Sequence, residues 1–175
     1  MMSQKVTHNE NNYYKRQSQG FSLIEVLVTL TVVSIGLLGL AGLQTSTQQH
    51  SRNAYYHTQT TIISQDMSER MRANSVALLA KNYHLVTPLR SAGCNTNAGC
   101  SPQQMANNDS YEWAEIIKNQ LPQGRGVVCI DSSPDDGTSS SPACDNTGSQ
   151  YAIKLWWHNT IEEKTMRSVS VLGFE

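Results

Sequence analysis

The sequence has few charged residues and no excess of either sign. Lys, Arg, Asp and Glu make up only 15% of its 175 residues, and the formal net charge is −1 at pH 7. Because nucleic-acid binding depends on basic side chains that contact phosphates, this balance does not indicate a nucleic-acid partner. The Gly-x-Ser-x-Gly, His-Glu-x-x-His and glycine-rich phosphate-loop motifs are also missing. The sequence therefore predicts neither an enzyme nor a bound cofactor.

Long hydrophobic runs are missing except at one place, and the mean hydropathy is −0.42. Phe21–Leu43 has 23 residues, of which 18 are apolar or glycine. As a helix it would span about 35 Å, enough to cross a bilayer core. A secretory signal would have a shorter run followed by a small-x-small cleavage site. Lys15 and Arg16 precede the run and the next positive charge is Arg52, so we expect a single-pass membrane protein whose N-terminus lies in the cytoplasm and whose body lies outside.

One carboxylate, Glu25, lies inside this apolar run. In an ordinary anchor it would reach toward the headgroups, which lowers its cost. Three features at fixed spacing favour another interpretation. Gly20 directly precedes the run, Phe21 begins it, and Glu25 follows four residues later. The block Gly-Phe-Ser-Leu-Ile-Glu-Val-Leu-Val resembles the cleavage and assembly motif of type IV prepilins.

This resemblance implies a leader peptide at residues 1–20 and a transmembrane or filament-core helix at 21–43. It also implies that the chain is stored in the bacterial inner membrane with a periplasmic body and then enters a cell-surface pilus. A membrane aspartyl prepilin peptidase would cut after Gly20, and Phe21 would become the N-methylated N-terminus. Glu25 would then pair with the N-terminal amine of an adjacent subunit. Because an unpaired carboxylate is costly in a low-dielectric core, Glu25 would enforce the register of assembly.

The apolar run also contains three glycines at a spacing of three, Gly36, Gly39 and Gly42. Small residues in a row along a helix permit close packing, although glycine is common in membrane helices in general. Major pilins often carry a proline where Gly42 stands here. The absence of a proline at position 42 is closer to what the resemblance implies for a minor pilin.

The region after the apolar run predicts a soluble domain at 44–175. No proline or glycine interrupts 45–82, and apolar side chains recur there at helical spacing. We therefore expect one helix of roughly 60 residues from Ser22, whose second half, 44–82, is amphipathic and packs on the soluble domain. The stripe consists of Tyr56, Ile63, Met67, Met71 and Leu78.

A second helix is predicted at 102–120. Ser101 is its N-cap, Pro102 occupies the first helical position and Gln104 completes a capping box. Three strands follow, near 126–131, 151–158 and 165–172. The middle strand alternates: Tyr151, Ile153, Leu155 and Trp157 share one face, and Ala152, Lys154, Trp156 and His158 share the other. Whether Trp156 is exposed depends on whether the second face is covered, which the sequence leaves open.

The four cysteines all follow the apolar run, which favours two disulfides in an oxidising compartment. Their spacing lacks the Cys-x2-Cys step of zinc ribbons and redox sites. Three connectivities are possible, and we favour the local pairs Cys94–Cys100 and Cys129–Cys144.

No metal site is expected. His50 and His57 share a helix face but have no cysteine or carboxylate partner nearby in the sequence. The acidic residues of the loop near 132–149 do not follow EF-hand spacing, so we interpret them as solvated. They are Asp131, Asp135, Asp136 and Asp145.

The order of these elements resembles the α/β-roll of pilins, an α+β fold with a long N-terminal helix on a small antiparallel sheet. The downstream pattern resembles PilV-type minor pilins, with Cys-x5-Cys, Met-Ala-x2-Asp-x3-Trp, Gly-Arg-Gly-Val-Val-Cys and Ile-Lys-Leu-Trp-Trp in succession. The second of these motifs consists of Met105, Ala106, Asp109 and Trp113.

The resemblance implies a minor type IV pilin that helps to prime pilus assembly and sits in or near the filament tip, supporting adhesion and twitching motility. Its partners would be other minor and major pilins, the prepilin peptidase and methylase, and the inner-membrane assembly platform. A type II secretion pseudopilin is one alternative. A tip adhesin is another, in which loop 132–149 or Trp156 would contact a surface. An envelope enzyme with a plain anchor would require a cluster of ionisable groups in a cleft.

Overall fold

The computed structural model describes residues 20–97, 99–159 and 164–173, in two units, Met1–Thr45 and Ser46–Glu175. Helix α1 (Leu23–Ala73) begins in the first unit. Within the described part of the chain, α1 is the one helix that is long and apolar enough to cross a membrane, as judged from length and composition. The predicted leader lies outside the described residues except for Gly20.

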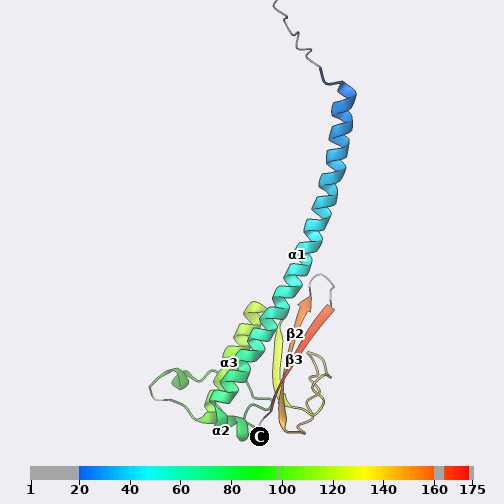
Figure 1. Ribbon diagram of the computed structural model, residues 1–175. Helices are drawn as coiled ribbons and strands as arrows, with labels where there is room; N and C mark the ends of the chain where they lie inside the picture. Colours follow the sequence, from blue (N-terminus) through cyan, green and yellow to red (C-terminus); the bar gives the residue numbers. More distant parts are fainter. Residues whose placement is uncertain (1–19, 98, 160–163, 174–175) are drawn as a thin grey trace, which may run out of the picture. The chain divides into compact units, whose positions relative to one another are not determined.

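The second unit contains a three-stranded antiparallel sheet in the order β1-β2-β3. The strands are β1 (Arg125–Ile130), β2 (Gln150–Asn159) and β3 (Lys164–Gly173). Helix α3 (Pro102–Gln120) and the C-terminal part of α1 lie on one side of this sheet (Figure 1). The predicted α+β, pilin-like fold is confirmed.

The core lies between these helices and the sheet. The predicted stripe of α1 belongs to it: Met67 and Met71 are completely buried, and Tyr56 packs against it from the edge. The strands contribute alternate residues to this side of the sheet, because successive side chains of a strand point to opposite faces. These residues are Val128, Ile130, Tyr151, Ile153, Leu155, Trp157 and Leu172.

The predicted continuous helix to about Asn82 is wrong, because α1 ends at Ala73. Asn74 takes non-helical dihedral angles (φ −105°, ψ 57°), and a five-residue helix, α2 (Ser75–Leu79), follows. The Asn74 side chain donates a hydrogen bond to the Tyr83 hydroxyl oxygen at 3.1 Å. Tyr83 is completely buried, so the break in the helix allows the chain to turn and place this ring in the core.

Helix α3 has the bounds that its caps predict. The Ser101 side chain accepts a hydrogen bond from the Gln104 backbone N–H, and the Gln104 side chain accepts one from the Ser101 N–H, at 3.2 and 2.9 Å. This capping box satisfies two backbone donors that a helix start leaves without partners. The indole N–H of Trp113 then donates to the Ile63 carbonyl at 3.0 Å, which joins α3 to α1.

The second face of the sheet is covered by the loop between β1 and β2. Two disulfides are present, Cys94–Cys100 and Cys129–Cys144, and the second ties this loop to β1. Trp156, on the face that the sequence left open, is only 3% exposed. The central strand is therefore buried on both faces, as is typical of a strand that lies between two layers.

Candidate functional site

The N-terminal end of the described chain presents three neighbouring features to solvent. Gly20 precedes the helix, Phe21 is 84% exposed, and Glu25 lies in the first turn of α1. The Glu25 backbone N–H donates to the Ser22 carbonyl at 3.0 Å, so the carboxylate stands where the helix begins. A helix N-terminus carries a partial positive charge that favours a carboxylate.

Folding of the described chain does not require a glycine at position 20. A Cβ atom added to Gly20 would meet no heavy atom within 4 Å, and the backbone there does not adopt a positive φ. The same geometry applies to Gly36, Gly39 and Gly42. Glycine at these positions is therefore explained better by contacts with other molecules than by packing within the chain.

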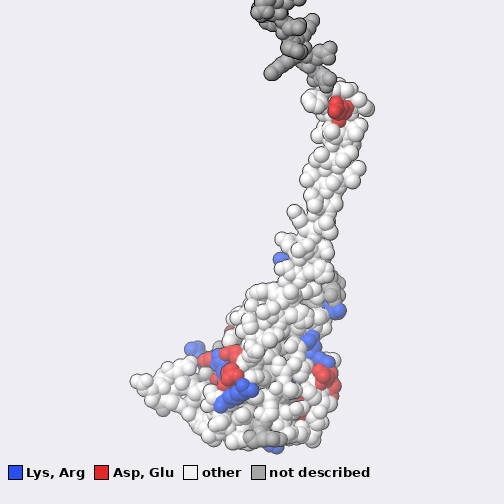
Figure 2. Space-filling view, in the orientation of Figure 1, with Lys and Arg blue, Asp and Glu red and all other residues white. Residues whose placement is uncertain are grey.

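The apolar part of α1 is not covered by any described residue of its own unit. Every residue from 20 to 45 is exposed, including the large side chains of Leu23, Ile35 and Leu38. An apolar surface of this extent indicates a membrane or a protein partner. On the face shown in Figure 2, this part of the helix is white apart from one acidic patch, and Glu25 is the one charged residue between 21 and 45.

Three other polar side chains in this apolar stretch are hydrogen-bonded to the helix itself. Thr29 donates to the Glu25 carbonyl, Thr31 to the Leu27 carbonyl and Ser34 to the Leu30 carbonyl, at 2.9, 2.8 and 2.6 Å. Such bonds reduce the cost of placing hydroxyl groups in hydrocarbon. Glu25 has no comparable side-chain hydrogen bond among the described residues, so its carboxylate remains available to a partner.

Residues 15–41 match the family model of the prokaryotic N-terminal methylation motif. The matched segment contains Gly20, Phe21 and Glu25 at the positions expected for a prepilin. The chain is prepilin-like. Comparisons with curated proteins and with solved structures found no match for it. This match supports a subunit of the pilin or pseudopilin type, and the apolar helix α1 supports a membrane anchor of one span within the described residues.

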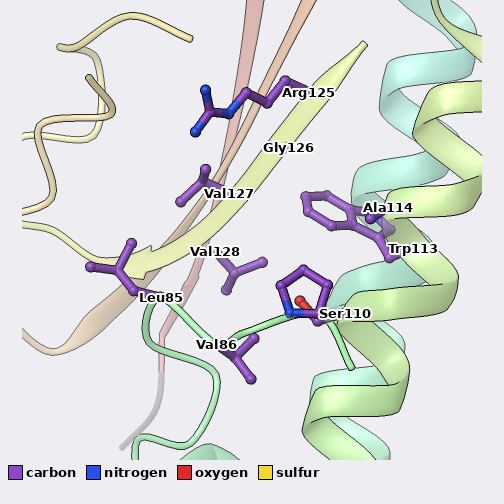
Figure 3. Close-up of a pocket in the computed structure, with 10 residues that line it drawn as sticks. Leu85, Val86, Ser110, Trp113, Ala114, Arg125, Gly126, Val127 and Val128 are labelled. Atoms are coloured by element: carbon purple, nitrogen blue, oxygen red, sulfur yellow. The ribbon is translucent and has the colours of Figure 1, made fainter. Parts of the chain in front are cut away.

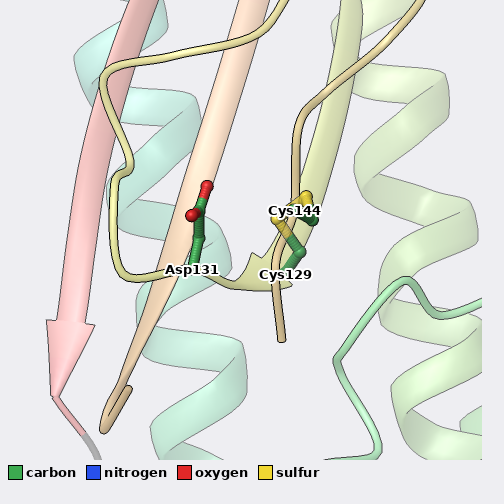
Figure 4. Close-up of side chains that lie close together, drawn as sticks. All are labelled: Cys129, Asp131 and Cys144. Carbon is green, nitrogen blue, oxygen red and sulfur yellow. A yellow bond between two sulfur atoms is a disulfide. The ribbon is translucent and has the colours of Figure 1, made fainter. Parts of the chain in front are cut away.

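The second unit of this prepilin-like protein contains one cluster with metal-ligand chemistry among its described residues (Figure 4). A sulfur of Cys129, a sulfur of Cys144 and a carboxylate oxygen of Asp131 lie within 4.8 Å of one another. The two cysteines form a disulfide, so neither offers the thiolate that a metal requires. The carboxylate of Asp131 is paired with Lys154. This cluster is therefore structural.

The interpretation of Asp131 as a solvated loop residue is wrong. Asp131 and Lys154 are both completely buried, and the lysine Nζ lies 2.5 Å from Asp131 Oδ2. The same Nζ donates to Asp136 Oδ1 at 3.0 Å and to the Pro142 carbonyl at 2.8 Å. Because Lys154 lies on β2 and its partners lie on the covering loop, the ammonium group fixes the loop to the sheet. The hydrogen bond from Lys154, followed by one from Ser133, lowers the pKa of Asp136.

The helical side of the domain has its own polar network. Arg70 on α1 contacts Asp66 at 2.9 Å, Glu112 at 2.8 Å and Asp109 at 3.5 Å. Asp109 also accepts a hydrogen bond from the Tyr83 hydroxyl at 2.5 Å. Burial, together with this carboxylate, raises the pKa of Tyr83. The network joins α1, α3 and the segment after α2.

Residues of the motif that resembles PilV-type pilins pack in the core or join its polar network. Ala106 and Trp113 are in the core, and Asp109 belongs to the Arg70 network. His57 packs its ring edge-on against Trp157, with the ring centroids 5.2 Å apart. Neither His50 nor His57 belongs to a metal-ligand group among the described residues. The buried Lys154 was missed from the sequence, although its position among aromatic residues in a strongly apolar strand was a signal for burial.

Proposed function

We propose that this protein is a minor type IV pilin, a structural subunit and not an enzyme, that helps to prime pilus assembly and sits in or near the filament tip. The observation that carries the proposal is the methylation-motif match over 15–41, with an exposed Glu25 in the first turn of an uncovered apolar helix. The leader would be 1–20, the membrane and filament-core segment 21–43, and the periplasmic body 44–175.

In this proposal the peptidase cuts between Gly20 and Phe21, and the new amine of Phe21 is methylated. The exposed apolar residues of α1 lie first in the inner membrane and then against the helices of neighbouring pilins. Within the filament core, Glu25 meets the N-terminal amine of a neighbour, because an unpaired carboxylate there is costly. The assembly platform and other minor and major pilins are the partners. Gly36, Gly39 and Gly42, which have open space beside them, would allow those helices to approach closely.

Deletion of the gene tests the role in the pilus. We expect fewer surface pili and weaker twitching motility, both restored by the wild-type chain. If pili and motility are normal but secretion of folded proteins fails, the chain is a type II secretion pseudopilin instead. The tip-adhesin alternative finds less support, because Trp156 is nearly completely buried and only the covering loop remains available.

Replacing Glu25 with alanine is expected to deplete the subunit from the filament without removing it from the membrane. The variant loses the carboxylate that would pair with an incoming amine, whereas the apolar surface that holds the helix in the bilayer remains. The measurement is the ratio of subunit in sheared pili to subunit in the membrane fraction. Glu69→Ala, which removes an exposed carboxylate from the soluble part of the same helix, is the control. Equal ratios for Glu25→Ala and wild type would contradict the pairing role.

A further inference from the structure

A pocket of about 280 Å³ lies between the edge strand β1, helix α3 and the segment 85–88 (Figure 3). Its walls are apolar and include Val86, Trp113, Ala114 and Val128. Arg125 lines the same pocket, is exposed, and pairs with no carboxylate among the described residues. The pocket therefore combines an apolar interior with a cationic side chain at its edge.

The backbone of β1 is partly open along this pocket. The Val128 carbonyl accepts from the Leu85 N–H at 2.9 Å, and the Ile130 N–H donates to His84 Nδ1 at 3.0 Å, so the amide groups of these residues point away from β2. Gly126 lies two residues before Val128, so its N–H and carbonyl also point away from β2. No described residue pairs with the outward amide groups of Gly126. An extended segment can therefore add there, but only for two or three residues, because the segment near Leu85 occupies the rest of the edge.

The two faces of β1 specify which side chains such a segment needs. Val128 faces the helices, whereas Arg125, an odd number of residues away, faces the opposite side. Neighbouring side chains of an added strand alternate in the same way. The pocket thus fits an apolar residue that is directly adjacent to an acidic residue.

Several neighbouring pairs of this chain have that pattern. Ile24–Glu25 and Ala114–Glu115 lie within helices, Ile130–Asp131 is buried, and Ile161–Glu162 lies between Asn159 and Lys164, which pair with each other. Phe174 and Glu175 also have the pattern, and they follow β3 directly. They cannot reach their own pocket. Gly126 is level with Leu155 and Ser168, five residues from the end of β3 at Gly173 and two strands away. The distance is about 17 Å along the sheet and about 10 Å across it, whereas two residues span only about 7 Å.

We propose that Phe174 and Glu175 of one copy dock on β1 of a second copy, with Phe174 in the pocket and Glu175 beside Arg125. The contact joins two different surfaces, so it repeats from copy to copy in a row instead of closing into a symmetric pair. It goes beyond the proposed pilin function and does not depend on leader cleavage, so the full uncleaved chain can be tested.

The test is photo-crosslinking of the purified full-length chain in detergent, with a benzophenone side chain in place of Phe174. Equal amounts of ¹⁴N-labelled and ¹⁵N-labelled chains are mixed and irradiated, and the crosslinked peptides are identified by mass spectrometry. We expect mixed-isotope crosslinks from position 174 to the pocket, around Val86, Ala114 and Val127. Crosslinks that join only peptides of one isotope, or that lie on other surfaces, would overturn the proposal.

Two sets of variants complete the test. Ala114→Phe fills the pocket and is expected to reduce the crosslink to background, whereas Glu115→Phe, on the exposed neighbouring position of α3, should leave it unchanged. Arg125→Glu leaves the core intact. It should lower the crosslink yield roughly two- to fivefold, the effect expected from the loss of an exposed ion pair. Glu175→Arg in the same chain should restore it. Equal yields for Ala114→Phe and Glu115→Phe, or no rescue by the charge exchange, would contradict the docking.

Discussion

Replacing Lys154 with methionine is expected to lower the free energy of unfolding by about 3–5 kcal/mol, because the buried Asp131 carboxylate then has no counter-charge. Both side chains of this pair are completely buried, and the lysine also holds Asp136 and the Pro142 carbonyl. The covering loop would lose its main polar attachment to β2. The measurement is urea unfolding of the full chain in detergent, followed by tryptophan fluorescence.

Two further variants separate this effect from a general loss of charge. Lys118→Met removes an exposed lysine from α3 and is expected to change the stability little. Asp131→Asn keeps the carbonyl oxygen that can accept from the Ser133 N–H but removes the negative charge. Combined with Lys154→Met, it should recover part of the lost stability, because no unpaired charge stays buried. If Lys154→Met is as stable as Lys118→Met, the ammonium group does not hold the loop.

The role of Lys154 can also be tested through the pH dependence of the stability. The hydrogen bond from Lys154 lowers the pKa of Asp136 in the folded state from its ordinary value of 3.8. A carboxylate whose pKa is lower in the folded state stabilises the fold above its unfolded pKa and loses that contribution as the pH falls through the folded pKa. Wild-type stability should therefore decline as the pH falls below about 4. Lys154→Met should show a shallower decline over the same range.

A Gly20→Leu chain is expected to accumulate in the uncleaved form, a nearly complete loss of processing. A peptidase pocket shaped for glycine has no room for a branched side chain, whereas the described chain leaves open space at this position, because a Cβ there meets nothing within 4 Å. Mass spectrometry of the membrane-extracted protein should identify methylated Phe21 as the N-terminus of the wild type and an intact leader in the variant.

Gly39→Leu is the matched control for this experiment. Gly39 lies in the same helix and also has open space around it, but it is 19 positions from Gly20, so we expect normal cleavage. An intact leader on the wild-type chain, in cells whose prepilin peptidase is active, would contradict the assignment of the cleavage site. Equal cleavage of Gly20→Leu and wild type would contradict the role of the glycine.

The features that could be predicted from the sequence depend on residues close together along the chain. The capping box of α3 involves Ser101 and Gln104, three positions apart, and its hydrogen bonds form as soon as the helix does. The stripe that contains Met67 and Met71 follows from helical periodicity alone. The disulfide pairs also follow chain proximity, with separations of 6 and 15 residues. The methylation motif is read from an ordered string of residues, and a linear pattern is sufficient to identify it.

The tertiary structure decided the features that depend on which surface covers another. No proline or glycine in the sequence marks the break of α1 at Asn74. The Asn74 side chain bonds to Tyr83, and the position of Tyr83 depends on its packing in the core. Lys154 has the composition of a surface residue and is buried only because the loop after β1 crosses the second face of the sheet, where Asp131 lies 23 positions away in the sequence. Trp156 is covered for the same reason. Local propensity cannot encode these contacts, since burial depends on the packing of segments that are distant along the chain.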